Sequence, residues 1–377
     1  MNTPISQIRI PSTLLPRDGR FGAGPARIRP AQLQALQAAA QSPLGTSHRQ
    51  APVKNLVRRV REGLTELYSL PEDYEVILGN GGASALWDAL TFSVVRDRAA
   101  HAACGEFSAK FATATKQAPF LKDSVISTAP GGELASVPVT PEADVFAWAH
   151  NETSTGVLSP VTRPASLRDD DVVVVDGTSA AGGVNIDIRE TDIYYFSGQK
   201  NLGTEGGLWI ALVSPRGLAR IENVASSGRW IPSFLDMHTA VENSRKNQTL
   251  NTPAITTLLL LAEQVEWILG EGGLQWAAER TSGMSTAIYD YAATSPVTTP
   301  FVHEAAHRSP VVCTIDLDET IDAAALTGVL RTHGIVDIEP YRKLGRNQVR
   351  IATFVSVEPS DVEALLACLD YVLNAAT

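Results

Sequence analysis

The sequence predicts an α/β fold with a mainly parallel sheet flanked by helices, followed by a smaller α+β domain. Short apolar runs alternate with segments of helical periodicity in the first part of the chain, a pattern typical of a layered α/β domain. After residue 270 the order becomes helix, strand, helix, strand, helix. We therefore expect a large domain of residues 17–270 and a small domain of residues 1–16 and 271–377, which the length of 377 residues allows.

Short apolar runs bounded by polar or turn-forming residues are the candidate strands. In the large domain they are residues 74–79 (YEVILG), 144–150 (DVFAWAH), 171–176 (DVVVVD), 193–197 (IYYFS) and 207–213 (GLWIALV). In the small domain they are residues 310–317 (PVVCTIDL) and 348–354 (QVRIATF), with a helix near 320–333 between them.

Helical periodicity is clearest in four segments of the large domain, residues 30–41, 54–68, 82–95 and 254–269. The last segment is the most apolar long stretch of the chain. It contains Glu263, Gln264 and Glu266, so we predict a buried helix of a globular protein rather than a membrane span.

Composition narrows the classes of function. Apolar residues make up 44% and charged residues 19% of the chain, as in ordinary globular proteins, and the formal net charge of -10 argues against a nucleic-acid surface. Cys104, Cys313 and Cys368 are far apart and form no CxxC pair, so we expect neither a metal site nor a disulfide framework. The start of the chain lacks a signal-peptide pattern, and we expect a cytoplasmic protein.

Polar residues cluster at the ends of the predicted strands. Asp176 ends the run of four valines, Lys200 follows the next strand along the chain, and Asn151 and Thr153 follow the preceding strand. The glycine-rich stretch GNGGAS, residues 79–84, follows the first strand. Because ligands of open α/β sheets bind outside the carboxyl ends of the strands, we predict a site formed by these residues.

The GNGGAS stretch has two interpretations. Glycines between a strand and a helix leave backbone N–H groups and the positive end of the helix free to bind a phosphate. As a dinucleotide-binding fingerprint the pattern is weak, because no strand-ending acidic residue follows about 20 residues later. A tight turn without a ligand is the alternative.

Asp176 and Lys200 also have two interpretations each. Taken singly, Asp176 could cap a turn or form a salt bridge, and Lys200 could extend into solvent. Taken together, a buried carboxylate for a cationic ring nitrogen, a lysine for a Schiff base and a glycine-led helix for a phosphate are the parts of a pyridoxal-phosphate site. The pairing of the two residues makes this prediction specific.

Several motifs resemble those of the phosphoserine aminotransferases, within the class V group of fold-type I pyridoxal-phosphate enzymes. They are HNETSTG (150–156), DGTSAAGG (176–183), FSGQKNLGTEGG (196–207) and NQTLNTPA (247–254). GPARI (24–28), GTSHRQAPV (45–53) and EPYRKLGRNQVRIATF (339–354) are similar too. The resemblance therefore covers nearly the whole chain, and it is closest to the actinobacterial branch.

The resemblance implies pyridoxal 5'-phosphate as the cofactor and two catalytic residues. Lys200 would hold the cofactor through its amine and, once freed by the substrate, would serve as the general base. Asp176 would keep the pyridine nitrogen protonated, because a nearby anion favours the charged form of that nitrogen.

Further cofactor contacts follow from the same resemblance. Ala83 and Ser84 match the phosphate-binding pair, and Phe107 matches the aromatic residue that stacks on the ring, which is tryptophan in other branches. Thr153 and Gln199 match cofactor-binding residues of the family. From the sequence alone Phe107 could equally be a core residue.

Asn251 and Thr252 match a pair that, in the family, reaches the cofactor phosphate from the neighbouring subunit, so the resemblance implies a homodimer. From the sequence alone, the stretch LNTPA also fits the start of a helix, with Thr252 as the N-cap and Pro253 in the first turn.

Substrate recognition is implied for four residues. Arg350 matches the arginine that binds the α-carboxylate, and His48, Arg49 and Arg342 match the pocket for a distal phosphate or carboxylate. The commoner family pattern has a histidine before the arginine that Arg342 matches and a shorter, glycine-rich closing motif. This chain has Tyr341 there.

The long closing motif also offers Lys343 and Arg346 as substitute cations or, alternatively, as parts of a solvated basic loop.

The activity implied is exchange of an amino group between O-phospho-L-serine with 2-oxoglutarate and 3-phosphohydroxypyruvate with L-glutamate, in L-serine biosynthesis. The alternatives are another class V member, such as an alanine:glyoxylate aminotransferase or a cysteine desulfurase, and a noncatalytic protein that binds phosphorylated metabolites. A desulfurase needs a thiolate on a mobile loop, whereas Cys313 and Cys368 lie in strand and helix patterns. We expect no membrane or nucleic-acid partner.

Overall fold

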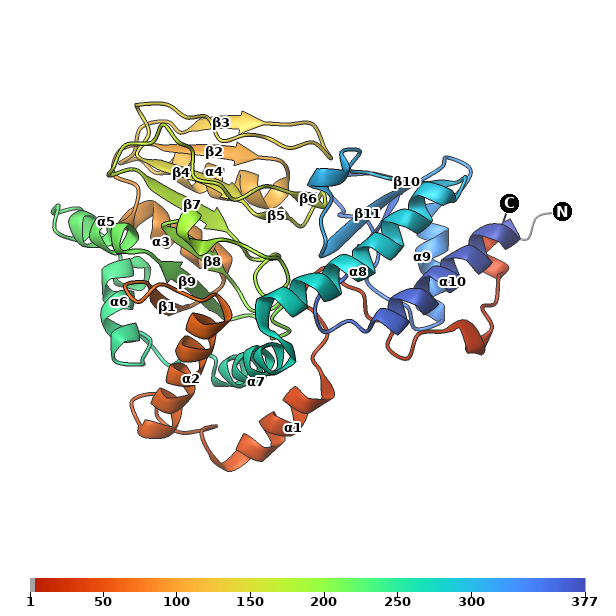
Figure 1. Ribbon diagram of the computed structural model, residues 1–377, viewed down its shortest axis with the longest axis horizontal. Coiled ribbons are helices and arrows are strands. Elements are labelled where there is room, and N and C mark those ends of the chain that lie inside the picture. Colours follow the sequence, from red (N-terminus) through yellow and green to blue (C-terminus); the bar gives the residue numbers. More distant parts are fainter. Residues whose placement is uncertain (1–3, 377) are drawn as a thin grey trace.

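The computed structural model describes residues 4–376 and contains a seven-stranded sheet whose faces are both covered by helices (Figure 1). Six strands run in one direction, and only β9 is antiparallel to its neighbours. In spatial order the strands are β1 Glu75–Asn80, β9 Leu208–Val213, β8 Ile193–Phe196, β7 Val172–Asp176, β4 Val145–Ala149, β2 Ala99–Ala103 and β3 Val125–Thr128.

The expected mainly parallel sheet with flanking helices is confirmed, and each of the five predicted strands of the large domain is present within one residue of its predicted limits. Two strands of this sheet, β2 and β3, have no counterpart in the sequence-based prediction. The β2 sequence AAHAA is mostly alanine, which favours helix, so only its burial between β3 and β4 makes it a strand.

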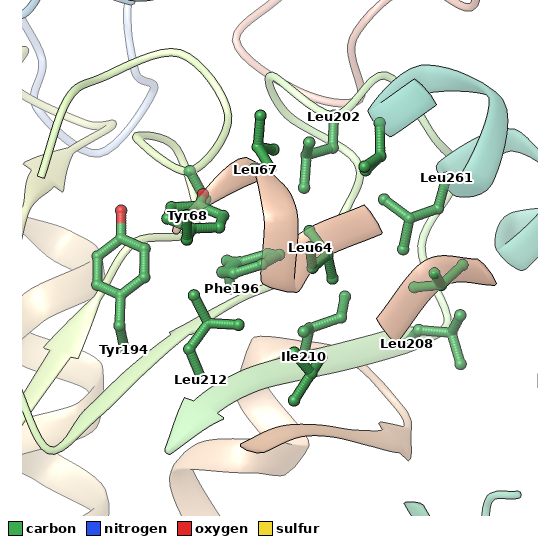
Figure 2. Close-up of a cluster of buried hydrophobic side chains, with 14 of the residues drawn as sticks. Leu64, Leu67, Tyr68, Tyr194, Phe196, Leu202, Leu208, Ile210, Leu212 and Leu261 are labelled. Atoms are coloured by element: carbon green, nitrogen blue, oxygen red, sulfur yellow. The ribbon is translucent and has the colours of Figure 1, made fainter. Parts of the chain in front are cut away.

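One face of the sheet packs against α2 Ala51–Leu67 and α7 Ile255–Glu271, with α1 Pro30–Ala38 lying on α7. The buried residues of α2 recur at helical spacing and are Val53, Leu56, Val57, Val60, Leu64 and Leu67. Leu64 and Leu67 meet Phe196 of β8 and Ile210 of β9 in this core (Figure 2). The α7 segment is therefore a buried helix, as predicted. Within residues 4–376 no helix is long and apolar enough to cross a membrane.

The opposite face packs against α3 Ala83–Ser93, α4 Glu106–Gln117, α5 Pro215–Ala225 and α6 Met237–Arg245. Side chains of a strand alternate between the two faces. In β8, Tyr194 and Phe196 join the core under α2, whereas Ile193 and Tyr195 join the core under α3. This alternation points Tyr195 toward the side of the sheet where α3 begins.

A separate antiparallel sheet consists of β10 Thr298–Pro300, β11 Val312–Leu317 and β12 Gln348–Ala352. It packs with α8 Gly273–Thr294, α9 Ala323–Thr332 and α10 Pro359–Ala376 around a core of its own. Ile8, Ile10 and Phe21 join that core, although they lie far away in the sequence. The predicted strands at 310–317 and 348–354 and the helix between them are confirmed.

We keep the division into residues 17–270 and the remainder as a proposal. Phe21, inside the predicted large domain, packs in the core of the small sheet. Residues 1–3 and 377 of the predicted small domain lie outside the described residues.

The remaining elements are short. They are the β5 Asn151–Glu152 and β6 Val157–Leu158 pair and the 3-10 turns Ile5–Gln7, Ser12–Leu14, Ala39–Gln41, Ile188–Glu190, Ser233–Leu235 and Ala305–His307.

Candidate functional site

A cavity of about 300 Å³ lies at the carboxyl ends of β7 and β8, where α/β sheets bind their ligands. Its size is at the lower end of the range of small-molecule sites. The structure brings seven of the nine predicted cofactor-binding residues into its wall: Ala83, Ser84, Phe107, Thr153, Asp176, Gln199 and Lys200.

Asp176 is the last residue of β7 and is 7% exposed. Its Oδ1 accepts a hydrogen bond from the Thr178 backbone N–H at 2.8 Å, and its Oδ2 accepts one from the Tyr195 hydroxyl at 3.1 Å. Trp87 of α3 donates its indole N–H to that hydroxyl at 2.8 Å. Asp176 therefore stands at the end of a chain of hydrogen bonds that fixes its orientation.

The Asp176 carboxyl forms no ion pair with any residue from 4 to 376, so the salt-bridge interpretation is wrong, although the bond from Thr178 does cap the following turn. Burial raises the pKa of this carboxyl, and the hydrogen bonds from Thr178 and Tyr195 act in the opposite direction. A buried carboxylate without a cation is costly. A cationic group bound in the cavity would stabilise it.

Lys200 follows β8, and its Nζ donates a hydrogen bond to the Ala23 carbonyl and lies 5.9 Å from the centre of the Phe107 ring. Burial, together with the positive charge of Arg350, lowers the pKa of the Lys200 amine to about 8, against the opposing charges of Asp176 and Glu152. The amine is thus neutral in a substantial fraction of molecules near pH 8, as a nucleophile must be. The solvated-lysine interpretation is wrong.

Gly24 makes the close approach of the N-terminal segment to Lys200 possible. Its φ of +124° favours glycine, and a Cβ at this position would lie 2.2 Å from Lys200 Nζ. The segment therefore covers the amine with backbone alone.

The other end of the cavity is formed by the start of α3, where Gly82 is the N-cap and no side chain caps the helix. Three buried polar atoms that border the cavity have no hydrogen-bond partner among the described residues: Asn151 Oδ1, Thr178 Oγ1 and Gln199 Oε1. Unpaired buried polar atoms are rare, so three around one cavity indicate a polar ligand. An uncapped helix start favours an anionic group there.

Arg350, on β12 of the small sheet, reaches the loop that follows β5. Its Nη1 donates to the Thr153 carbonyl at 3.0 Å, and its Nε is buried without a partner among the described residues. Burial lowers the pKa of this guanidinium, and the charges of Tyr341 and Glu152 oppose that effect. An unpaired, buried N–H of arginine at the rim of the cavity fits the predicted binding of a carboxylate.

Six of the predicted site residues do not line the cavity within one chain: His48, Arg49, Asn251, Thr252, Arg342 and Arg350. The His48 Nδ1 and the Thr252 hydroxyl lie 3.1 Å apart, and burial with the charge of Arg49 lowers the pKa of His48. Arg49, Asn251 and Thr252 are exposed.

The alternative interpretation of Thr252 as a helix N-cap is wrong. Helix α7 begins at Ile255 with Ala254 as N-cap and no side-chain cap, because the Thr252 hydroxyl bonds His48 instead.

The three cations of the exposed loop after Tyr341 differ in whether they form ion pairs. Lys343 pairs with Glu106 of α4, and Arg346 forms two bonds with Asp316, at 3.0 and 2.6 Å. Arg342 is exposed and does not line the cavity. Lys343 and Arg346 are therefore both engaged within the chain, and neither is available as a substitute cation without breaking an ion pair.

Sequence analysis missed Trp87, Tyr195, Glu152 and Gly24. No local signal marks Tyr195, because its role depends on the pairing of the parallel strands β7 and β8, which places it opposite Asp176. Trp87 lies one turn into α3, and no local pattern distinguishes it from a core residue.

A larger, open depression of about 670 Å³ lies at the amino ends of β2 and β4 and contains none of the predicted site residues. Its cations, Arg96, Arg98, Lys122 and Arg168, each form an ion pair. The carboxyl-end cavity is therefore the better candidate.

Comparison with known proteins identifies the family. The class V aminotransferase model matches residues 21–338. The chain belongs to this family. It is 56% identical over 98% of its length to a putative phosphoserine aminotransferase of Mycobacterium avium, covering 98% of that protein. It is 50% identical to a phosphoserine aminotransferase of Rhodococcus opacus, with 99% of each chain covered.

The fold is similar to that of a crystal structure of a phosphoserine aminotransferase from Cytophaga hutchinsonii, with a TM-score of 0.85, 23% identity, and coverage of 93% of this chain and 97% of that one. The family match makes the protein a class V aminotransferase, whose cofactor is pyridoxal phosphate. The cavity fits this group, since it presents an unpaired carboxylate, an amine of lowered pKa and an uncapped helix start.

Proposed function

We propose that the protein is a phosphoserine aminotransferase. It would exchange an amino group between O-phospho-L-serine with 2-oxoglutarate and 3-phosphohydroxypyruvate with L-glutamate, running toward phosphoserine in L-serine biosynthesis. The observation that carries the proposal is the cavity in which the Lys200 amine lies near Asp176 on the large sheet and Arg350 on the small one. The names of relatives at 50% to 56% identity support the choice of substrate.

Lys200 and Asp176 would perform the chemistry. When bound, pyridoxal phosphate supplies an electron sink for the bond broken at the substrate α-carbon. The Lys200 Nζ binds the cofactor and later takes and returns the α-carbon proton, which its lowered pKa permits near neutral pH. The Asp176 carboxylate favours the protonated form of the ring nitrogen, and Tyr195 and Trp87 hold it in place.

The remaining residues would bind and orient. Phe107 packs on the ring, while the start of α3 at Ala83 and Ser84 binds the cofactor phosphate together with Gln199. Thr153 would lie beside the cofactor, and the Thr153 carbonyl accepts a hydrogen bond from Arg350. Arg350 takes the substrate α-carboxylate.

We further propose a cytoplasmic homodimer. Asn251 and Thr252 are exposed and lie outside the cavity of their own chain, beside His48 and Arg49. In a dimer with two-fold symmetry these residues could complete the cavity of the partner, with Asn251 and Thr252 on the cofactor phosphate. His48, Arg49 and Arg342 would then bind the distal anion of the substrate.

The visible spectrum of the purified protein tests the proposal. Titration with phosphoserine or glutamate should convert the cofactor band to that of the pyridoxamine form at low concentrations, whereas serine and alanine should not, because they lack a distal anion. Conversion by alanine as effective as by phosphoserine would favour an alanine:glyoxylate type of enzyme. A protein that stays colourless after incubation with pyridoxal phosphate would favour a noncatalytic binding protein.

A further inference from the structure

Glu152 is a fully buried carboxylate for which the chemistry described above has no use. It ends β5, directly before Thr153, and has an exposed fraction of 0%. Among the described residues no lysine, arginine or histidine forms an ion pair with it. A charge in this position needs compensation of another kind.

The compensation comes from five hydrogen bonds. Oε2 accepts from the backbone N–H and hydroxyl of Ser108, at 2.9 and 2.7 Å. Oε1 accepts from the backbone N–H and hydroxyl of Ser154, at 3.1 and 2.7 Å, and from the Phe107 backbone N–H at 3.3 Å. A carboxylate with this many donors is held in a single orientation.

These bonds replace the missing cap of α4. Its N-cap, Gly105, has no side chain, and the first three N–H groups of the helix need acceptors. Glu106 N–H bonds the Ser154 hydroxyl at 3.0 Å, while the next two bond Glu152. The N-terminus of α4 is thus capped by Glu152, at the end of β5, and by Ser154 in the loop that follows, and the negative charge also faces the positive helix end.

Gly105 provides the space that the Glu152 and Ser154 side chains need at the start of α4. Its backbone is extended, so the conformation does not require glycine. A Cβ at this position, however, would lie 2.4 Å from Glu152 Cγ and 2.4 Å from Ser154 Oγ. The glycine is needed because the carboxylate approaches the helix start closely.

The second residue of α4 is Phe107, whose ring lines the cavity and lies 5.9 Å from Lys200 Nζ. The backbone that carries this ring is the one bonded to Glu152. We propose that Glu152 is a positioning residue for the cofactor. It fixes the position of the Phe107 ring in the cavity through the backbone of α4, and it places a fixed negative charge at the start of that helix. The inference rests on the cofactor site proposed above.

The charge has a separate, measurable effect. Besides burial, the groups that act on the Lys200 pKa are Arg350, which lowers it, and Asp176 and Glu152, which raise it. Neutralising Glu152 would leave Arg350 opposed by Asp176 alone. The protonated form of the group at Lys200 becomes less stable, so its titration midpoint moves to lower pH.

The test is Glu152→Gln in the holoenzyme, with cofactor affinity measured by equilibrium dialysis and the pH dependence of the visible band by spectroscopy. The amide keeps the shape but turns a donor toward backbone N–H groups that need an acceptor. We expect cofactor affinity to fall about tenfold, since one unmatched buried hydrogen bond costs about that much. The band midpoint should move to lower pH.

Two variants separate the cap from the charge. Ser154→Ala removes one donor to Glu152 and the acceptor of the Glu106 N–H but keeps the charge, so affinity should fall several-fold with an unchanged midpoint. Glu142→Gln removes one exposed charge far from the cavity, and both readouts should stay at wild-type values.

Wild-type affinity and an unchanged midpoint in a folded Glu152→Gln would overturn the inference. If that variant does not fold, Ser154→Ala decides, and wild-type affinity there overturns the positioning role. A wild-type protein that binds no pyridoxal phosphate would instead contradict the proposed function itself.

Discussion

At the level of single residues, the site depends on how buried charges are oriented. Asp176 was identifiable from the sequence, because an acidic residue at the end of four valines is unusual. Tyr195 and Trp87, which orient it, look like ordinary core residues in the sequence. Their hydroxyl and indole groups acquire a role only through the register of β7 and β8 and the start of α3.

Tyr195→Phe tests this orientation. The substitution leaves both Asp176 Oδ2 and the Trp87 indole without their partner, so we expect stability to fall by about 1–3 kcal/mol and cofactor affinity to fall several-fold. Chemical denaturation and cofactor titration measure the two effects. Tyr194→Phe is the matched control. Tyr194 lies on the same strand but faces the other side of the sheet, where its hydroxyl hydrogen-bonds His150 instead of Asp176. An equal loss of affinity in both variants would contradict a specific role for Tyr195.

The Lys200 amine makes cofactor addition depend on pH. The neutral amine is the reactive form, so the rate at which cofactor-free protein gains the visible band should rise to a plateau with a midpoint near the pKa of about 8, not near the ordinary value of 10.5. Arg350→Met removes a positive charge that disfavours the protonated amine, so the midpoint should move to higher pH. Arg346→Met, whose charge is paired with Asp316, should leave it in place. A midpoint unaffected by Arg350→Met would show that Arg350 does not contribute to the lowered pKa of Lys200.

At the level of elements, the sequence indicated the central strands near the site better than it indicated β2 and β3. The Val-rich and aromatic runs of β7, β8 and β9 are recognisable from composition, whereas β2 is nearly all alanine. The start of α7 was predicted to within one residue, but the alternative assignment of its N-cap to Thr252 was wrong, because the Thr252 hydroxyl lies against His48. Local patterns do not contain such long-range contacts.

The N-terminal segment is an element of the site that lacks secondary structure. Gly24→Ala would place a methyl group on Lys200 Nζ and force alanine into a positive φ, so we expect stability to fall by about 1–3 kcal/mol and cofactor binding to weaken at least tenfold. Gly283→Ala, inside α8 with open space around it, is the control and should be neutral or slightly stabilising. Normal cofactor binding in Gly24→Ala would mean that the segment moves away without cost.

At the level of the whole molecule, only some of the predicted site residues meet at one cavity within the chain. The fold class could be predicted from the sequence, and seven of the nine residues predicted to bind the cofactor do line the cavity. The contacts of the cations near the end of the chain could not be predicted, because a cation in the sequence does not reveal its partner. Lys343 and Arg346 were open candidates until their ion pairs with Glu106 and Asp316 were seen.

A mixing experiment tests the proposed shared site. Lys200→Ala alone should be inactive, and a double variant Asn251→Ala with Thr252→Ala should be strongly impaired. Refolding the two together should restore about a quarter of wild-type turnover, because half of the dimers then contain one intact site out of two. The separate proteins, mixed without subunit exchange, are the control. No recovery in proven heterodimers would place Asn251 and Thr252 outside the partner's site.

The bond between Arg350 and the Thr153 carbonyl links substrate recognition to a contact between distant parts of the chain. The guanidinium that connects β12 of the small sheet to the loop after β5 is also the group proposed to hold the substrate carboxylate. A substrate carboxylate that competes with the Thr153 carbonyl for Arg350 would weaken this contact, and loss of the contact would change affinity for the carboxylate by the same factor. Amines that lack a carboxylate would leave the bond between Arg350 and Thr153 intact.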